Sequence, residues 1–310
     1  MASKKAAARH GLLLIDKPGG WTSHDVVARV RRLAGQRQVG HTGTLDPMAT
    51  GLMAVLLGSA TRLEPWLTKM DKVYRGQMEL GLATDTDDVT GRELSRRGGP
   101  WPTEEVVRRA LKNREGEGDQ IPPAFSAIQV DGQRAHKAAR AGRPLRLEAR
   151  RVTAYRLEPL DWRPPLLDFR AEVSSGYYIR SLARDVGEEF FLGGALSALR
   201  RERVGPWSLE AAVTLEELAA WTEEDWRDKL KTPAEALPHW PGLTLDGDQA
   251  RRFILGQKLP VEEPTAPGRY KILNPAGLLL GLAETEYKPS LGGTEPRRPF
   301  LRPLRVFPVE

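Results

Sequence analysis

Apolar runs and their spacing predict strands and helices in the first quarter of the chain. Residues 12–15 and 52–57 are short, unbroken apolar runs typical of buried strands. Between them, a Pro-Gly-Gly turn at 18–20 precedes apolar residues at 26, 27, 30 and 33, which recur at helical spacing. We therefore expect strand, loop and helix, then a glycine-rich stretch at 40–51 and a second strand.

In the middle of the chain, apolar residues recur with both the two-residue period of strands and the 3.6-residue period of helices. Residues 72–80 alternate, which predicts a half-buried strand with Tyr74 on its apolar face. Residues 104–112 predict a helix capped by Thr103, and 152–157 and 166–173 predict strands. After a Ser-Ser-Gly break, apolar residues at 179, 182, 183 and 186 form a helical stripe that Arg180 and Arg184 do not join.

The last third changes character. A capping box from Thr214 to Glu217 opens another helix, and the Trp- and Pro-rich residues 221–240 resemble a linker. The final 70 residues are short apolar runs separated by glycine and proline, a pattern typical of a small all-β barrel or sandwich. We expect a flexible basic tail over 1–10, a large main domain over 11–240 and a small all-β domain over 241–310. Strands and helices without regular alternation indicate an α+β fold, with a mixed, largely antiparallel sheet flanked by helices and loops.

Charge is concentrated in one segment. The chain carries 47 Lys and Arg against 41 Asp and Glu, a net charge of +6. Residues 131–156 contain eight basic and two acidic residues, so this segment alone holds that surplus. It is either a solvated surface or an arm that contacts phosphates. Arg134, Lys137 and Arg140 fall on one arc of a helix predicted there, an arrangement suited to contacting phosphates.

Composition excludes several classes of site and protein. The chain has no cysteine, which rules out disulfides, thiolate catalysis and cysteine-based zinc sites, and its five histidines lack metal-ligand spacing. We expect no metal. No apolar run approaches the roughly 18 residues of a membrane span, so we expect no membrane association and a cytoplasmic protein.

The densest cluster of candidate functional residues is the loop at 40–51, Gly-His-Thr-Gly-Thr-Leu-Asp-Pro-Met-Ala-Thr-Gly. Its glycines allow close backbone approach, and Pro47 restricts Asp46 to an extended conformation. Asp46 is either a turn-capping carboxylate or a catalytic one. Residues 35–42 nearly match a phosphate-binding loop of NTPases, but His41 replaces the lysine, and the segment follows a helical pattern rather than a strand.

Four motifs together resemble the TruB-type tRNA pseudouridine synthases, and they occur in family order. They are KPGGWTS at 17–23, GHTGTLDPMATG at 40–51, KVYRGQMELG at 72–81 and SSGYYIRSLARDVG at 174–187. The resemblance extends over about residues 11–215. More loosely, the last 70 residues resemble the RNA-binding PUA domain that ends these proteins.

The resemblance implies a role for each matched residue. Asp46 would be the catalytic carboxylate, Tyr74 would stack on the target base, and Arg180 would pair with Asp46. His41, Tyr178 and Leu199 would complete the pocket, with His41 helping to open the RNA loop, and Lys17 would contact RNA. From the residues alone, Tyr74 and Leu199 are better explained as core side chains and Arg180 as an exposed helix charge, so their pocket roles depend on the resemblance.

The implied reaction converts a uridine in the T loop of tRNA, at position 55, to pseudouridine. It exchanges the C1′–N1 bond for C1′–C5 and transfers nothing to or from a second molecule, so we expect no cofactor. It needs a flipped base, an aromatic platform and an ionised carboxylate, which acts either as a nucleophile or as a base at the 2′ carbon. We expect tRNA as the partner, no required protein partner and a monomer.

Two other functions stay open, and the sequence departs from the family pattern at several positions. A tRNA-binding chaperone without chemistry would also use the basic arm, and an NTPase would use residues 35–42. The chain has Phe125-Ser-Ala-Ile-Gln129 where the family commonly has Tyr-Ser-Ala-x-Lys. His136 stands where a tyrosine is usual, and Gln38 where a lysine is frequent. These differences bear on RNA contacts in the arm rather than on the carboxylate.

Overall fold

The computed structural model describes residues 8–261, 266–287 and 299–307. Most of the tail expected over 1–10 lies outside these ranges. Arg9, which we had included in it, is packed in the structure. Its guanidinium donates to the Ala34 carbonyl at 2.8 Å and pairs with Glu223 at 2.7 Å.

A nine-stranded mixed sheet forms the main body. Seven strands follow the order β1-β3-β12-β4-β11-β10-β7, while β2 pairs with β3 and β13 with β12. Every pairing is antiparallel except β3 with β12, which confirms a mixed, largely antiparallel sheet. The strands are β1 (Gly11–Lys17), β2 (Val39–His41), β3 (Thr50–Leu57), β4 (Lys72–Leu80), β7 (Gly116–Gln120), β10 (Arg150–Arg163), β11 (Leu166–Val173), β12 (Gly194–Val204) and β13 (Trp207–Ser208).

Helices and two short hairpins flank this sheet. The helices are α1 (Ser23–Ala34), α2 (Glu64–Leu67), α3 (Glu104–Lys112), α4 (Ala135–Arg140), α5 (Ile179–Glu189), α6 (Leu215–Ala219) and α7 (Glu223–Lys229), with 3-10 turns η1 (Gly58–Leu63) and η2 (Leu209–Ala211). The hairpins are β5 (Leu82–Thr84) with β6 (Glu93–Arg96), and β8 (Gln129–Val130) with β9 (Gln133–Arg134).

The apolar pattern explains how these elements pack. Along β1, Leu13 and Ile15 face the cluster covered by α1, α6 and α7, while Leu12 and Leu14 face the opposite cluster. Both faces of this half-sheet are therefore buried, which is why its strands are apolar throughout. In the other half, buried and more accessible residues alternate along β4 as predicted. The apolar stripes of α3 and α5 are buried in the same cluster as the apolar face of this half-sheet.

The two halves of the sheet meet at a narrow junction. β3 and β12 pair through only two residue pairs, Thr50 with Arg200 and Gly51 with Arg201. Gly51 has φ +99°, and a Cβ there would lie 2.4 Å from the Arg201 carbonyl oxygen. Glycine is thus required where the loop at 42–49 enters β3, and this loop carries Asp46 to the junction.

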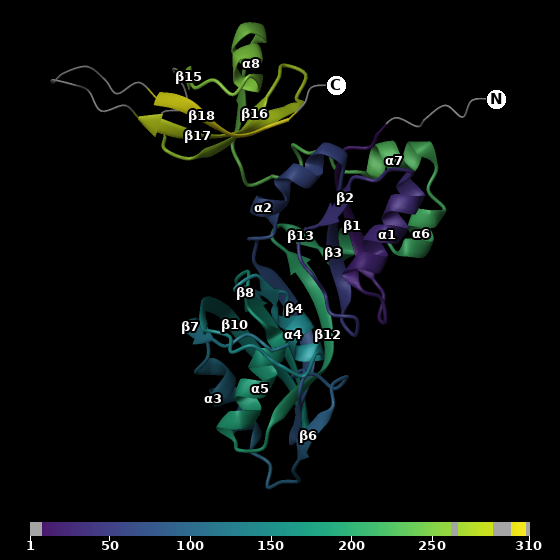
Figure 1. The fold of residues 1–310 in the computed structure, drawn as a ribbon, viewed down its shortest axis with the longest axis vertical. Coiled ribbons are helices and arrows are strands. Elements are labelled where there is room, and N and C mark those ends of the chain that lie inside the picture. Colours follow the sequence, from purple (N-terminus) through teal and green to yellow (C-terminus); the bar gives the residue numbers. More distant parts are fainter. Residues whose placement is uncertain (1–7, 262–265, 288–298, 308–310) are drawn as a thin grey trace, which may run out of the picture.

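The C-terminal residues form a second, five-stranded sheet at one end of the molecule (Figure 1). Its order is β14-β16-β17-β18-β15, and a helix, α8, packs against it. The elements are β14 (Gly242–Thr244), α8 (Gly247–Ile254), β15 (Leu259–Pro260), β16 (Arg269–Leu273), β17 (Leu279–Tyr287) and β18 (Pro299–Val306). The strands agree with the expected β structure, and α8 is an addition that the glycine and proline pattern did not predict. The glycine pair at 292–293, part of that pattern, lies outside the described residues.

The interpretation of residues 221–240 as a linker was wrong. Thr222 caps α7 through a second capping box, and Trp226 and Trp240 are buried against the main body. Lys231 also pairs with Leu12 of β1. The tryptophans supply enough apolar surface to fold the segment back onto the sheet. In the described part of the chain, no helix is long and apolar enough to cross a membrane.

Candidate active site

The loop that carries Asp46 is fixed on both sides of this residue. The Ser23 hydroxyl donates to the Leu45 carbonyl at 3.1 Å and accepts from the Leu45 amide at 2.9 Å. The Gly20 amide donates to the Pro47 carbonyl at 2.8 Å. Turn 18–22 and the start of α1 therefore position the carboxylate before any substrate binds.

Arg180 connects this loop to the other half of the sheet. Its Nε lies 2.9 Å from Oδ2 of Asp46, and its Nη2 donates to Oδ1 at 3.3 Å, so both carboxylate oxygens are engaged. The same guanidinium donates to the carbonyls of Thr86 at 2.9 Å and Phe125 at 3.0 Å. Its side chain is 7% exposed, against 32% for Asp46, so the carboxylate is reachable and its partner is not. The predicted pairing is present, although Arg180 is buried rather than an exposed helix charge.

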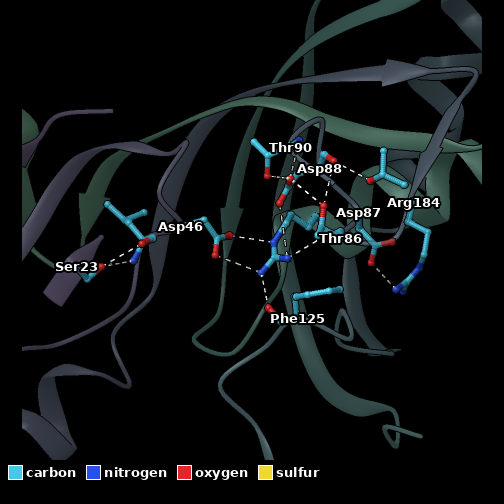
Figure 2. Close-up of polar contacts among 11 residues, drawn as sticks. Ser23, Asp46, Thr86, Asp87, Asp88, Thr90, Phe125 and Arg184 are labelled. Carbon is cyan, nitrogen blue, oxygen red and sulfur yellow. Dashed lines mark hydrogen bonds and ion pairs between the residues drawn. The ribbon is translucent and has the colours of Figure 1, made fainter. Parts of the chain in front are cut away.

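An acidic loop that our sequence analysis did not single out holds Arg180 from the other side. Oδ2 of Asp88 lies 3.7 Å from Nη1 of Arg180, and this carboxylate accepts hydrogen bonds from Thr86 and Thr90. Figure 2 shows Asp46 on one side of the central guanidinium and the Thr86–Asp88 turn on the other. The sequence signal was Asp85-Thr-Asp-Asp88, three carboxylates in one turn, which alone does not reveal the arginine they face.

Burial raises the pKa of Asp46 above that of a free aspartate. The Arg180 cation lowers this pKa and Asp88 raises it, but the loss of water around the carboxylate is the largest influence. Arg180 by itself favours the charged form of Asp46, but the net direction of the pKa shift is upward. The bidentate contact remains the geometry of an ionised carboxylate.

The predicted aromatic and aliphatic pocket residues gather around the same loop. Tyr74 on β4 and Leu199 on β12 are 8% and 9% exposed, and both belong to the apolar cluster that includes Leu45 of the loop carrying Asp46. Tyr178 precedes α5, and its backbone exchanges two hydrogen bonds with the Gln120 amide. Burial raises the pKa of the Tyr178 phenol, so it is neutral at ordinary pH.

His41 lies near the start of the loop at 40–51 and is uncharged. Burial is the main reason that its pKa is lowered, and the neighbouring His24 and Arg201 lower it further. The Gly43 amide donates to Nδ1 of His41 at 3.2 Å, which leaves Nε2 as the protonated nitrogen. His41 is thus arranged to donate a hydrogen bond from Nε2.

Lys17 does not face a surface where RNA could reach it. It is fully buried, and its ammonium donates to the carbonyls of Pro18, Trp21 and Pro47. All three donors are therefore used within the protein. This corrects the predicted RNA contact: Lys17 supports the turn and loop on which Asp46 depends.

The basic segment is divided between several elements. Arg134 ends β9, Lys137 and Arg140 lie on the short helix α4, and all three are exposed. Arg150, Arg151 and Arg156 instead belong to β10 of the main sheet, so the arm is shorter than the expected 131–156. The carbonyls of Ile121 and Phe125, just before the arm, accept hydrogen bonds from Ser181, Arg184 and Arg180 on α5.

The NTPase interpretation of residues 35–42 fails on structure. Gly35 ends α1 in a left-handed conformation, and residues 39–41 form β2, so the segment joins a helix to a strand. A phosphate-binding loop needs the reverse order. Within the described residues, no group of three or more histidine and acidic side chains is placed to hold a metal ion.

The sheet is mixed and largely antiparallel, and at the junction of its two halves it holds one arginine-paired carboxylate near an aromatic side chain. This combination fits the class of pseudouridine synthases. Two family models match the chain: the N-terminal domain of TruB family pseudouridylate synthases over residues 31–179, and the C-terminal domain of tRNA pseudouridylate synthase B over 180–237. The chain belongs to the TruB family.

Individual relatives agree with this assignment. The tRNA pseudouridine synthase B of Thermobifida fusca is 44% identical over 283 residues, which covers 88% of this chain and 94% of that protein. The Ralstonia pickettii protein of the same name is 43% identical over 259 residues, covering 82% of this chain and 80% of that one. Among solved structures, a Cbf5–Nop10–Gar1 complex matches with a TM-score of 0.73 and 26% identity, covering 96% of this chain and 85% of that chain.

Proposed function

We propose that the chain isomerises a uridine in the T loop of tRNA, at position 55, to pseudouridine. Pseudouridine formation in tRNA is the activity that its family membership and its named relatives support. The observation that carries the proposal is the bidentate contact between buried Arg180 and partly exposed Asp46. One carboxylate is thus held in a defined orientation while one side of it stays accessible to a sugar.

Each pocket residue has a task in the proposed reaction. The target base leaves its stack and lies against Tyr74 and Leu199, which offsets part of the cost of flipping. Asp46 acts at the sugar while the C1′–N1 bond breaks, the uracil turns and C5 joins C1′. N1 then carries a proton, and the hydrogen of C5 is released to water. Arg180 keeps Asp46 in place, and neutral His41 donates a hydrogen bond to the opened RNA loop.

The rest of the molecule would bind the remainder of the tRNA. We propose that residues 11–240 form the catalytic domain and 241–310 a PUA-like RNA-binding domain. Exposed Arg134, Lys137 and Arg140 would grip phosphates of the T arm. The protein would act as a monomer in the cytoplasm, without a required protein partner or cofactor. Nothing in the structure favours the alternative of a chaperone without chemistry.

The product and its position test this proposal. Unmodified tRNA incubated with the protein should acquire one pseudouridine, at position 55, detected by chemical mapping of the RNA. A transcript with cytidine at that position should acquire none. A protein that binds both transcripts and modifies neither would be a chaperone and would contradict the proposal.

A further inference from the structure

A second surface next to the catalytic loop has the chemistry of an RNA subsite. A cleft of about 350 Å³ lies between turn 18–22 and the outer face of α1. This volume is within the range of sites that hold small ligands. Its lining residues are Gly20, Trp21, Asp25, Ala28, Arg29 and Arg32.

The helix part of this cleft is a single stripe. Positions 25, 28, 29 and 32 follow the i, i+3, i+4, i+7 spacing, so their side chains share one face of α1. The buried stripe of the same helix consists of other positions, including Val26 and Val30. In the described part of the chain the structure gives Arg29 and Arg32 no acidic partner, so their charges remain available for an anion.

Trp21 supplies an aromatic surface at the other side of the cleft. It is 38% exposed, although a tryptophan of a single folded chain usually buries its ring. Its backbone carbonyl accepts a hydrogen bond from Lys17, so the residue is fixed in position while part of its side chain stays accessible. An exposed indole beside two arginines is suited to stack on a base whose phosphate the arginines bind.

Asp25 determines which part of the cleft would take the phosphate. Hydrogen bonds from Thr22 lower the pKa of Asp25, so it is ionised, and both residues are engaged in the cap of α1. Its negative charge disfavours a phosphate near the start of the helix. Arg29 and Arg32, one and two turns further along, attract it there instead.

The cleft adjoins the active site, because Gly20 in its lining and the neighbouring Ser23 and His24 contact the loop that carries Asp46. Gly20 donates to the Pro47 carbonyl, one residue after Asp46, and Ser23 exchanges two hydrogen bonds with Leu45, one residue before it. The ring of His24 lies edge-on to His41, with centroids 6.0 Å apart. RNA that places a uridine at Asp46 therefore passes close to this surface.

We propose that this cleft is an RNA-binding subsite for a nucleotide flanking the target uridine. Its base stacks on Trp21 and its phosphate binds Arg29 and Arg32. The inference rests on the proposed function, because it takes its ligand to be the same tRNA.

The test is the affinity for unmodified tRNA at several salt concentrations. Replacing Arg29 and Arg32 together by glutamine should weaken binding and reduce the slope of log Kd against log salt by about 0.7 to 0.9 for each lost phosphate contact. Trp21→Ala should raise Kd about tenfold without changing the slope, and Trp21→Phe should restore most of the affinity. The single-turnover rate at saturating enzyme should stay close to wild type in all of them.

A matched control removes two exposed arginines elsewhere. Arg108→Gln with Arg109→Gln changes the charge equally on α3, far from α1 (Figure 1), and should leave affinity and slope unchanged. Unchanged affinity and slope in the Arg29 and Arg32 variant would overturn the inference. So would a loss of single-turnover rate with unchanged affinity. If the wild type binds tRNA but forms no pseudouridine, the proposed function fails, and the binding comparison still decides the subsite.

Discussion

At the scale of single residues, opposing influences act on the charge of Asp46. Burial raises its pKa above the ordinary value of 3.8, and Arg180 only partly compensates. The reaction needs the ionised form, so activity should be lost as pH falls through the pKa of the folded protein. We therefore expect the acid limb of the single-turnover rate to have its midpoint above pH 3.8. A limb at or below that value, in a protein shown to remain folded, would contradict the raised pKa.

Asp88 gives a second prediction at this scale, because it is a buried carboxylate that faces Arg180 from the side opposite Asp46. Asp88→Asn keeps the size of the side chain and removes its charge, so the guanidinium loses one of its anchors. We expect kcat to fall by about 100-fold with little change in KM for tRNA, since a small misplacement of the catalytic group is enough for such a loss.

The matched control for Asp88 lies in the same loop. Asp85 pairs with exposed Arg92, and among the described residues Arg180 contacts Asp46 and Asp88 but not Asp85. Asp85→Asn should therefore retain nearly full activity. Equal losses in the two variants would show that loop charge, and not the support of Arg180, matters.

The sequence was enough to predict the candidate site residues, but not the contacts that surround them. Asp46, Tyr74 and Arg180 could be named from motifs. The burial of Arg180 could not be predicted, because it depends on contacts with Thr86, Asp88 and Phe125, which are far from Arg180 in the sequence. Lys17 was misassigned for a similar reason: a lysine near a turn gives no sign that three carbonyls will surround it.

At the scale of elements, periodic segments were predicted almost residue by residue. The strand over 72–80, the helix over 104–112 and the strand over 166–173 match β4, α3 and β11. These elements have one buried face and one more accessible face, which is the condition under which the apolar period is visible. α7 and α8 were missed because prolines and glycines near them dominated the pattern, although Thr222 and Asp246 are good helix caps.

Gly51 provides a prediction for the β3–β12 junction. A Cβ at this position would meet the backbone of Arg201 at 2.4 and 2.7 Å, and φ is +99°. Because backbone cannot yield as a side chain can, Gly51→Ala should lower the free energy of unfolding by about 1–3 kcal/mol and reduce activity. The comparison is Gly118→Ala on edge strand β7, where a Cβ meets nothing within 4 Å. Similar unfolding curves for both variants would show that the junction has no such constraint.

At the scale of the whole molecule, the C-terminal sheet packs on the main body through a shared core. Leu282 on β17 and Phe307 belong to the same buried cluster as Trp240 and Leu12 of β1. The Arg62 side chain also donates to the Val306 carbonyl at 2.8 Å. The two sheets are thus held together by apolar packing, which no local pattern in the sequence could indicate.

Leu282→Ala should weaken this contact between the sheets. We expect a loss of about 2–5 kcal/mol in the free energy of unfolding, as for other large-to-small core substitutions, and a larger rise in KM for tRNA than fall in kcat. Leu278→Ala, at a residue 57% exposed in the preceding turn, should behave like wild type. If the two variants cannot be distinguished in stability and KM, the interface contributes little to either.

The central claim is that a single carboxylate, that of Asp46 held by buried Arg180, catalyses the isomerisation of uridine. The most direct measurement is release of tritium from C5-labelled uridine in unmodified tRNA, comparing wild type with Asp46→Asn under single-turnover conditions and at matched tRNA occupancy. The substitution keeps the shape of the side chain and removes its ionisable oxygen. The account predicts release by the wild type, and none above background by the variant although it binds tRNA. Release at the wild-type rate by Asp46→Asn would contradict it.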